Sequence, residues 1–222
     1  MTASAQIVEG VRADLRARAD PARAAAQQAY MTSAMPFRGV PVPEVRRLTR
    51  QRAKGVADAG TLRAAAEALW SGAEVREERY AALAILALRP LQDDPSLLGT
   101  IERCVREGQW WDLVDELAHR VADQLEVRPR ETARLVRAWA GNDDMWLRRI
   151  AIISQLGRGT ALDETLLDDA IRPNIADTEF FVRKAIGWAL RDHARVAPDW
   201  VRAYVEAHPL SPLSRREALR NL

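Results

Sequence analysis

The sequence predicts an all-α protein whose short helices pack in pairs, as in a curved α-solenoid of HEAT-like repeats. Three observations support this fold class. Apolar residues recur at i, i+3, i+4 and i+7 through nearly every segment, and no segment alternates as a strand would. Gly and Pro stand at the ends of these segments. A spacing of 35 residues also relates four helix starts along the chain.

The expected helices follow one another with brief connections. Proline favours the first helical turn because its missing N–H would have no partner there, whereas glycine favours the end of a helix. Prolines at such starts are Pro21, Pro43, Pro129, Pro198 and Pro212, and glycines at ends are Gly108, Gly141 and Gly157. Together with the apolar periodicity, these residues predict helices over 3–19, 21–34, 42–54, 61–70, 74–88, 96–107, 110–125, 129–140, 144–156, 162–171, 178–195, 198–207 and 212–221.

Four of these helices begin at equal intervals. Their head residues are Arg76, Trp111, Trp146 and Phe181, each 35 positions after the one before. A period of this length accommodates two helices and two turns, which is close to the HEAT-like repeat, and no tetratricopeptide consensus is present. We therefore expect a single domain over 1–222, with basic N-terminal helices in 1–57, core repeats in 74–195 and C-terminal helices in 198–222.

Charge is distributed unevenly along the chain. Residues 1–57 contain ten basic and four acidic side chains, residues 58–179 contain fifteen and 23, and residues 180–222 contain eight and four. Both ends are therefore basic. Of the 33 cationic side chains 31 are Arg, whose planar guanidinium suits phosphate. High genomic GC content would enrich Arg as well, without any functional reason.

Composition argues against several classes of protein. The longest apolar run, Ala81 to Leu88, is far too short to span a membrane, and the N-terminus has no apolar signal region. The single Cys104 cannot form an internal disulfide, and the three histidines have no metal-ligand spacing. We therefore expect a cytoplasmic, monomeric protein without metal or cofactor and without a membrane partner.

The repeat also places several polar and aromatic side chains in corresponding positions. Positions 0, +3, +4 and +7 from each head residue form one stripe along a helix. Across the repeats this stripe contains Trp111, Asp115, Trp146, Arg149, Phe181, Lys184 and Trp188. From the spacing alone, a second interpretation is possible. The stripe would then be partly buried in the core, and its charged residues would form ordinary ion pairs at the edge of that core.

The same region resembles the AlkD-type DNA alkylation repair glycosylases, which are built from HEAT-like repeats. The resemblance rests on Tyr30-Met31 with the block from Gly39 to Leu48, on WWDLVDELA at 110–118, MWLRRIAIISQL at 145–156, EFFVRKAIGWALRDHA at 179–194 and PLSRREAL at 212–219. These blocks are spread over nearly the whole chain, in the order of the family. The stretch from Thr32 to Arg38 departs from the more basic and aromatic family pattern.

The resemblance implies a monofunctional hydrolase that releases cationic N-alkylpurines, such as 7-methylguanine and 3-methyladenine, from duplex DNA. It implies a catalytic group of Trp111, Asp115, Arg149 and Trp188. Asp115 would stabilise the oxocarbenium-like sugar and orient water, the indoles would face positive charge, and Arg149 would hold a phosphate. The other tryptophans are expected to pack in the core between helices rather than to act in catalysis. They are Trp70, Trp110, Trp139, Trp146 and Trp200.

DNA contacts are expected mainly at the two basic ends. The expected set is Tyr30, Arg46, Arg47, Arg148, Arg183, Lys184, Arg215 and Arg216. Two other classes of function remain open: a non-catalytic HEAT-like protein that binds DNA, and a scaffold that binds a peptide partner. Asp115 separates the first from the glycosylase, because a carboxylate in a groove that only binds a polyanion repels phosphate. The acidic middle of the chain favours the scaffold, but the family blocks outweigh it.

Overall fold

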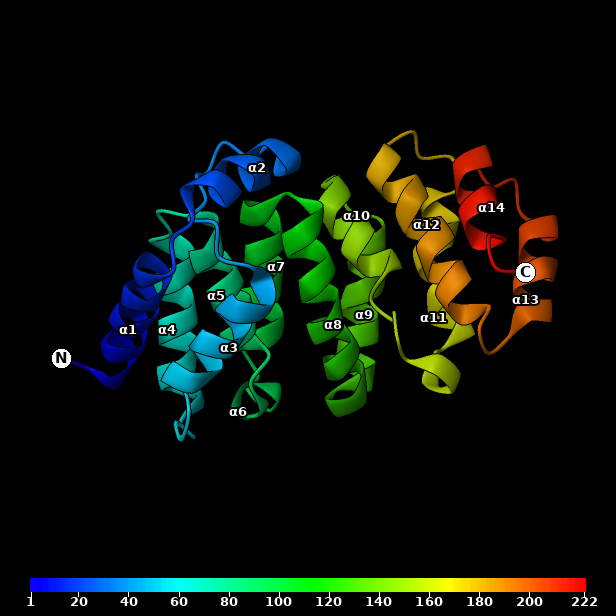
Figure 1. Cartoon of the computed structure of the whole chain (residues 1–222). Coiled ribbons are helices and arrows are strands. Elements are labelled where there is room, and N and C mark those ends of the chain that lie inside the picture. Colours follow the sequence, from blue (N-terminus) through cyan, green and yellow to red (C-terminus); the bar gives the residue numbers. More distant parts are fainter. The chain divides into compact units, whose positions relative to one another are not determined.

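The computed structural model describes all 222 residues, which form fourteen α-helices, two short 3-10 helices and no β-strand. The all-α prediction is confirmed (Figure 1). All thirteen expected helices are present, and the sequence pattern missed only α6 (Arg89–Gln92), a single turn. The chain forms two compact units, 1–97 and 98–222. The single domain and the curvature of the array stay predictions.

The N-terminal unit packs its helices around an apolar core. Its helices are α1 (Ala3–Ala17), α2 (Pro21–Met31), α3 (Val42–Arg52), α4 (Ala59–Ser71), α5 (Arg76–Leu86) and α6. The helix α5 packs against α3 and α4, and α1 also packs against α3 and α4. Buried apolar residues such as Leu48, Leu69 and Ile85 fill the space between them. Helix α5 is buried almost throughout, which makes it the centre of this unit.

A buried carboxylate holds the loop that follows α2. Glu77 of α5 is fully buried, and its Oε1 accepts hydrogen bonds from the backbone N–H groups of Arg38 (2.9 Å), Gly39 (2.8 Å) and Val40 (3.1 Å). Gly39 has a φ of 84°, and a Cβ there would lie 2.2 Å from the carbonyl oxygen of Asp20. The loop therefore passes close to the start of α2 at the one residue type that permits the approach.

The C-terminal unit arranges its helices in two rows. Its helices are α7 (Leu97–Gly108), which starts at the last residue of the first unit, α8 (Trp111–Val127), α9 (Pro129–Ala140), α10 (Met145–Ile152), α11 (Glu164–Ile171), α12 (Phe180–His193), α13 (Pro198–Ala207) and α14 (Pro212–Ala218). In one row α10 packs between α8 and α12, and in the other α9 packs against α11 (Figure 1). Helix α9 also contacts α8 and α10, so consecutive helices pair across the two rows, as the 35-residue period predicts.

The helix heads lie where the period places them. Helices α5 and α8 begin at Arg76 and Trp111, and α10 and α12 begin one residue before Trp146 and Phe181. Helix α10 ends at Ile152 rather than at the predicted residue 156. The side chain of Gln155 exchanges two hydrogen bonds of 2.9 Å with the backbone of Asp163, and this ties the turn after α10 to the start of α11.

The helices α12 and α14 make an unusually close contact in this unit. A Cβ on Gly187 of α12 would lie 2.4 Å from Cβ of Glu217 and 2.9 Å from the carbonyl oxygen of Ser214, both on α14. The hydroxyl of Ser214 donates to the carbonyl oxygen of Arg183 (2.9 Å). The absence of a side chain at Gly187 therefore lets α14 seat its buried residues directly against α12.

Candidate active site

The structure brings Asp115 and Arg149 together across neighbouring helices. Asp115 lies one turn into α8, and Arg149 lies on α10, which packs against α8. Arg149 Nε donates to Asp115 Oδ1 and Nη2 donates to Oδ2, both at 2.8 Å. The third guanidinium nitrogen, Nη1, donates to the carbonyl oxygen of Phe181 in the first turn of α12 (2.6 Å). One arginine thus links three successive helices of the row.

This geometry corrects the expected role of Arg149. Its side chain is only 1% exposed, and all three nitrogens already have acceptors, so it has no open position for a phosphate. Asp115 instead keeps 21% of its side chain exposed. The bidentate pair fixes the plane of the carboxylate, and part of the side chain stays accessible to solvent. Arg149 is therefore placed to orient Asp115 rather than to bind DNA.

Burial and charge act on Asp115 in opposite directions. Desolvation raises the pKa of Asp115 above its usual range, and it outweighs the hydrogen bonds and charge of Arg149, which lower it. The charge of Asp112, one turn earlier, also raises this pKa, and His119, one turn later, lowers it. A carboxyl with a perturbed pKa and a specific charged partner is typical of functional sites.

Trp188 lies beside this pair on α12. The guanidinium carbon of Arg149 is 5.4 Å from the centre of the Trp188 ring, and Nζ of Lys184 is 5.7 Å from it. Trp188 is half-buried, which leaves part of the indole accessible. Trp111 is half-buried too and lies four residues before Asp115 on α8, so both occupy one face of that helix. The four predicted catalytic residues thus come from α8, α10 and α12.

The aromatic side chains at the helix heads form a separate cluster. Trp146 and Phe181 have ring centres 5.0 Å apart, and Trp110 lies 5.5 Å from Phe181 and 6.0 Å from Trp146. Trp146 is buried, in agreement with the core interpretation, and Trp110 is half-buried. This cluster packs the starts of three helices and so supports the backbone carbonyl of Phe181 that Arg149 binds.

The residues predicted to contact DNA in the C-terminal unit differ in their exposure and in their partners within the protein. Arg148 pairs with Asp177 (3.0 Å), and Arg183 donates to the backbone carbonyl of Asp177 (2.7 Å). Lys184 pairs with Glu217 (2.8 Å). These three cations therefore have acceptors within the protein, and the sequence did not predict these pairings. Arg215 and Arg216 on α14 are exposed, although Arg215 also donates to a backbone carbonyl of α13.

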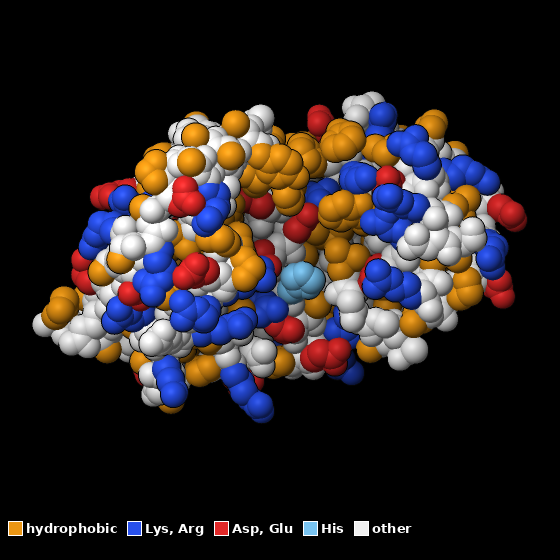
Figure 2. Space-filling view, viewed as in Figure 1, with side chains coloured by type: hydrophobic (Ala, Val, Ile, Leu, Met, Phe, Trp, Pro, Cys, Tyr) orange, Lys and Arg blue, Asp and Glu red, His pale blue; other side chains and the backbone are white.

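The other predicted contacts lie in the N-terminal unit. Tyr30, at the end of α2, is exposed to 78%. On α3, Arg46 is half-buried, and Arg47 is exposed and pairs with Glu44 (3.4 Å). In the C-terminal unit, Figure 2 shows Lys and Arg side chains gathered over α12 and α14 with apolar side chains between them. Each basic end therefore carries exposed cations, in line with the uneven charge distribution.

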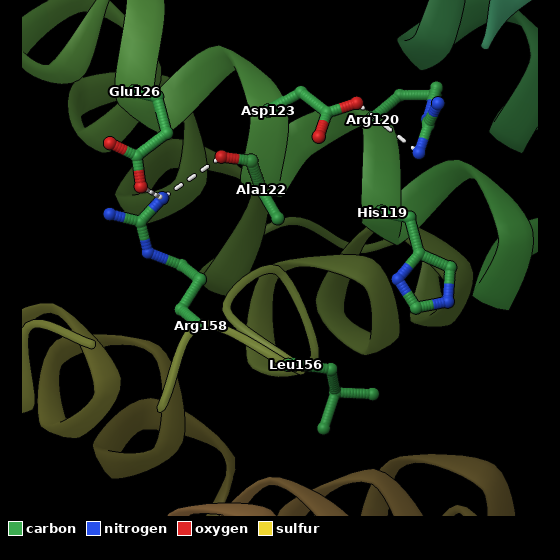
Figure 3. A pocket seen from close by; sticks show the side chains of 8 residues that line it. His119, Arg120, Ala122, Asp123, Glu126, Leu156 and Arg158 are labelled. Atoms are coloured by element: carbon green, nitrogen blue, oxygen red, sulfur yellow. Dashed lines mark hydrogen bonds and ion pairs between the residues drawn. The ribbon is translucent and has the colours of Figure 1, made fainter. Parts of the chain in front are cut away.

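A surface pocket of about 420 Å³ lies further along α8, between its second half and the turn after α10. Its wall carries charges of both signs. Arg158 donates to the carbonyl oxygen of Ala122 (2.9 Å) and pairs with Glu126 (2.8 Å), and Arg120 pairs with Asp123 (3.2 Å) (Figure 3). His119 also lines it. The pocket does not include Asp115 or Trp188, so the residues of the candidate site lie outside it.

Comparison with known proteins agrees with the resemblance seen in the sequence. A family model described as DNA alkylation repair enzyme matches residues 11–222. A solved structure titled as a predicted DNA alkylation repair enzyme from Enterococcus faecalis superposes with a TM-score of 0.83 at 29% sequence identity, covering 92% of this chain and 96% of that chain. No curated protein sequence matches the chain significantly. The chain therefore belongs to the DNA alkylation repair enzyme family.

Proposed function

We propose that this protein is a monofunctional DNA glycosylase that releases cationic N-alkylpurines from duplex DNA. The observation that carries the proposal is Asp115, whose carboxylate a buried arginine holds in one orientation while part of the side chain stays exposed. Membership in the family supports a role in alkylation repair. The glycosylase reaction and its substrates, 7-methylguanine and 3-methyladenine, are our proposal.

The reaction needs electrostatic stabilisation more than acid catalysis. An N7- or N3-alkylated purine carries a positive charge, so the bond from N9 to C1′ breaks with its electron pair going to the base, which leaves neutral. The deoxyribose then carries oxocarbenium character. Water adds to C1′ and loses a proton, which yields an abasic site. A single carboxylate beside the sugar can therefore supply the main catalytic contribution.

Asp115 suits this task in its ionised form. Its negative charge would stabilise the developing positive charge on the sugar, and the carboxylate would orient or deprotonate the attacking water. Trp111 and Trp188 would place indole faces near the lesion nucleotide, where the ring quadrupole attracts positive charge. Arg149 is a positioning residue, because its fork fixes the carboxylate and its own charge is buried beneath it.

Exposed cations would bind the flanking backbone. Arg47, Arg215 and Arg216 are exposed and suited to phosphate, and Tyr30 is exposed on α2. Such contacts would fix the register of the duplex without reading its sequence. The cytoplasmic location and the monomeric state are proposals of the same kind. None of the helices has the length and hydropathy required to cross a membrane.

The test is direct measurement of base release. The protein is incubated in excess with a duplex that contains one 7-methylguanine, and free base is quantified against the same duplex without protein. We expect release well above spontaneous depurination. Binding to the duplex without release would contradict the glycosylase and favour the non-catalytic DNA-binding alternative. Absence of both release and DNA binding would favour the protein scaffold.

A further inference from the structure

Two cations flank the Trp188 indole, and this bears on how a positively charged substrate is accepted. The Arg149 guanidinium carbon and Lys184 Nζ lie 5.4 and 5.7 Å from the centre of the ring. A cation at this distance uses the same ring quadrupole that a cationic base would use. It also repels such a base and the oxocarbenium sugar. Without compensation, these two side chains would oppose the proposed reaction.

Each of the two cations is paired with a carboxylate. Arg149 is paired with Asp115, and Lys184 Nζ is 2.8 Å from Glu217 Oε1. Glu217 also binds Arg191 through its other oxygen, at 2.8 Å. Glu217 is 7% exposed, so water screens these contacts only partly. The second carboxylate thus comes from α14, outside the α8, α10 and α12 row.

The backbone of α12 makes room for Glu217. A side chain at Gly187 would overlap Cβ of Glu217, so glycine at this position is what lets the carboxylate reach Lys184 and Arg191. The pairing with Lys184, and the charge of Arg191, hold the pKa of Glu217 below its usual range, which keeps it ionised at neutral pH. The blocks FFVRKAIGWALRD and PLSRREA are therefore joined by the ion pairs of Lys184 and Arg191 with Glu217.

We infer that Glu217 is a specificity-determining residue, which neutralises Lys184 beside Trp188 and so lets the site favour a positively charged substrate over a neutral one. The inference rests on the proposed function and extends it to a residue outside the catalytic group. Glu217 acts through Lys184 and Trp188 and is therefore a positioning residue. Its removal would leave uncompensated positive charge beside the indole.

The test uses two abasic-site analogues that differ by one charge. One duplex contains a neutral tetrahydrofuran, and the other contains a pyrrolidine whose ring nitrogen is protonated. The measured quantity is the ratio of the two dissociation constants for the full chain. We expect the wild-type protein to prefer the cationic analogue, and Glu217→Gln to lower that preference by roughly threefold to tenfold, as expected for one charge at partly screened distance.

An undamaged duplex separates this effect from a loss of structure. Removing a negative charge near DNA should leave the affinity for undamaged duplex unchanged or raise it. A damaged fold would instead weaken the binding of all three duplexes, the two that contain analogues and the undamaged one. Glu206→Gln, an exposed glutamate on α13, is the matched control and should not change the ratio. The double variant Glu217→Gln, Lys184→Met removes both charges and should restore the preference to near its wild-type value.

Other outcomes would overturn the inference. It fails if Glu217→Gln keeps the wild-type ratio, if Glu206→Gln lowers the ratio equally, or if the wild-type protein does not distinguish the two analogues. Should Glu217→Gln not fold, Lys184→Met alone must raise the preference for the cationic analogue. A wild-type protein that prefers the cationic analogue but releases no 7-methylguanine would refute the proposed function and leave the charge effect of Glu217 standing.

Discussion

The Asp115–Arg149 pair places a functional charge where burial disfavours it. A buried arginine without a counterion would be costly, and a buried carboxylate alone would become protonated. Pairing the two in a bidentate contact stabilises both, and part of the Asp115 side chain stays exposed. The orientation of the carboxylate and the stability of the C-terminal unit therefore depend on the same two hydrogen bonds.

The raised pKa of Asp115 predicts a pH-dependent rate. Because the ionised form stabilises the sugar, base release should fall as pH falls through the raised pKa, which lies above the ordinary value of 3.8. The free energy of unfolding depends on pH in the opposite direction. The folded state binds the proton of Asp115 more tightly than the unfolded state does, so this group's contribution to stability is lost as pH rises from the ordinary pKa through the raised pKa. Single-turnover rates, corrected for spontaneous depurination, should show an inflection above pH 3.8.

Asp115→Asn should reduce base release about 10²- to 10³-fold, the magnitude measured for comparable electrostatic groups. It should also lower the free energy of unfolding by about 2–4 kcal/mol, because Arg149 loses its charged partner while buried. Asp169→Asn is the control, since it removes a more exposed pair with Arg137 in the other helix row and should cost below about 1 kcal/mol. A folded Asp115→Asn protein with the wild-type rate would refute the catalytic assignment.

Arg149→Lys separates positioning from DNA binding. Lysine keeps the charge but cannot make the two parallel hydrogen bonds of a guanidinium. We expect base release to fall about 10- to 100-fold, as for other residues that orient a reactive group, with little change in the dissociation constant for duplex DNA. If affinity and rate fell together, Arg149 would contact phosphate after all.

At the level of helices, the 35-residue spacing predicted where α5, α8, α10 and α12 begin, because the period of a repeat fixes helix starts. It also placed Asp115 and Arg149 on the corresponding stripes of their two helices. It could not show that Arg149 binds Asp115 instead of phosphate, since spacing gives the angle of a residue on its helix but not the partner of a long side chain. The contacts of Glu77 and Glu217 were missed for the same reason.

Gly187→Ala tests the contact between α12 and α14. The added methyl group would lie 2.4 Å from Cβ of Glu217 and 2.9 Å from a backbone oxygen, so α14 must shift. We expect the free energy of unfolding to fall by about 1–3 kcal/mol in urea titrations. Gly99→Ala in α7 has no atom nearby and should instead stabilise the protein by about 0.5–1 kcal/mol. Equal effects at both positions would contradict this account of the packing.

Across the whole chain, the distribution of cations predicts how DNA binding responds to salt. Seven expected cationic contacts would give a slope of about −6 for log K against log salt. Because several of these cations, among them Arg148, Arg183 and Lys184, already have partners in the protein, we expect a slope less steep than this value and slight sequence preference. Arg216→Ala should make the slope less steep by about 1, whereas Arg202→Ala, which pairs with Asp199, should leave it unchanged.

The loop held by Glu77 also affects the order in which the N-terminal unit can be completed during synthesis. The carboxylate lies 38 positions after Gly39, so the ribosome makes the loop well before it makes the group that fixes it. At ordinary translation rates of about 5–20 residues per second, this interval lasts about 2–8 seconds. Throughout that time the backbone N–H groups of residues 38–40 lack the acceptor that Glu77 provides in the folded unit.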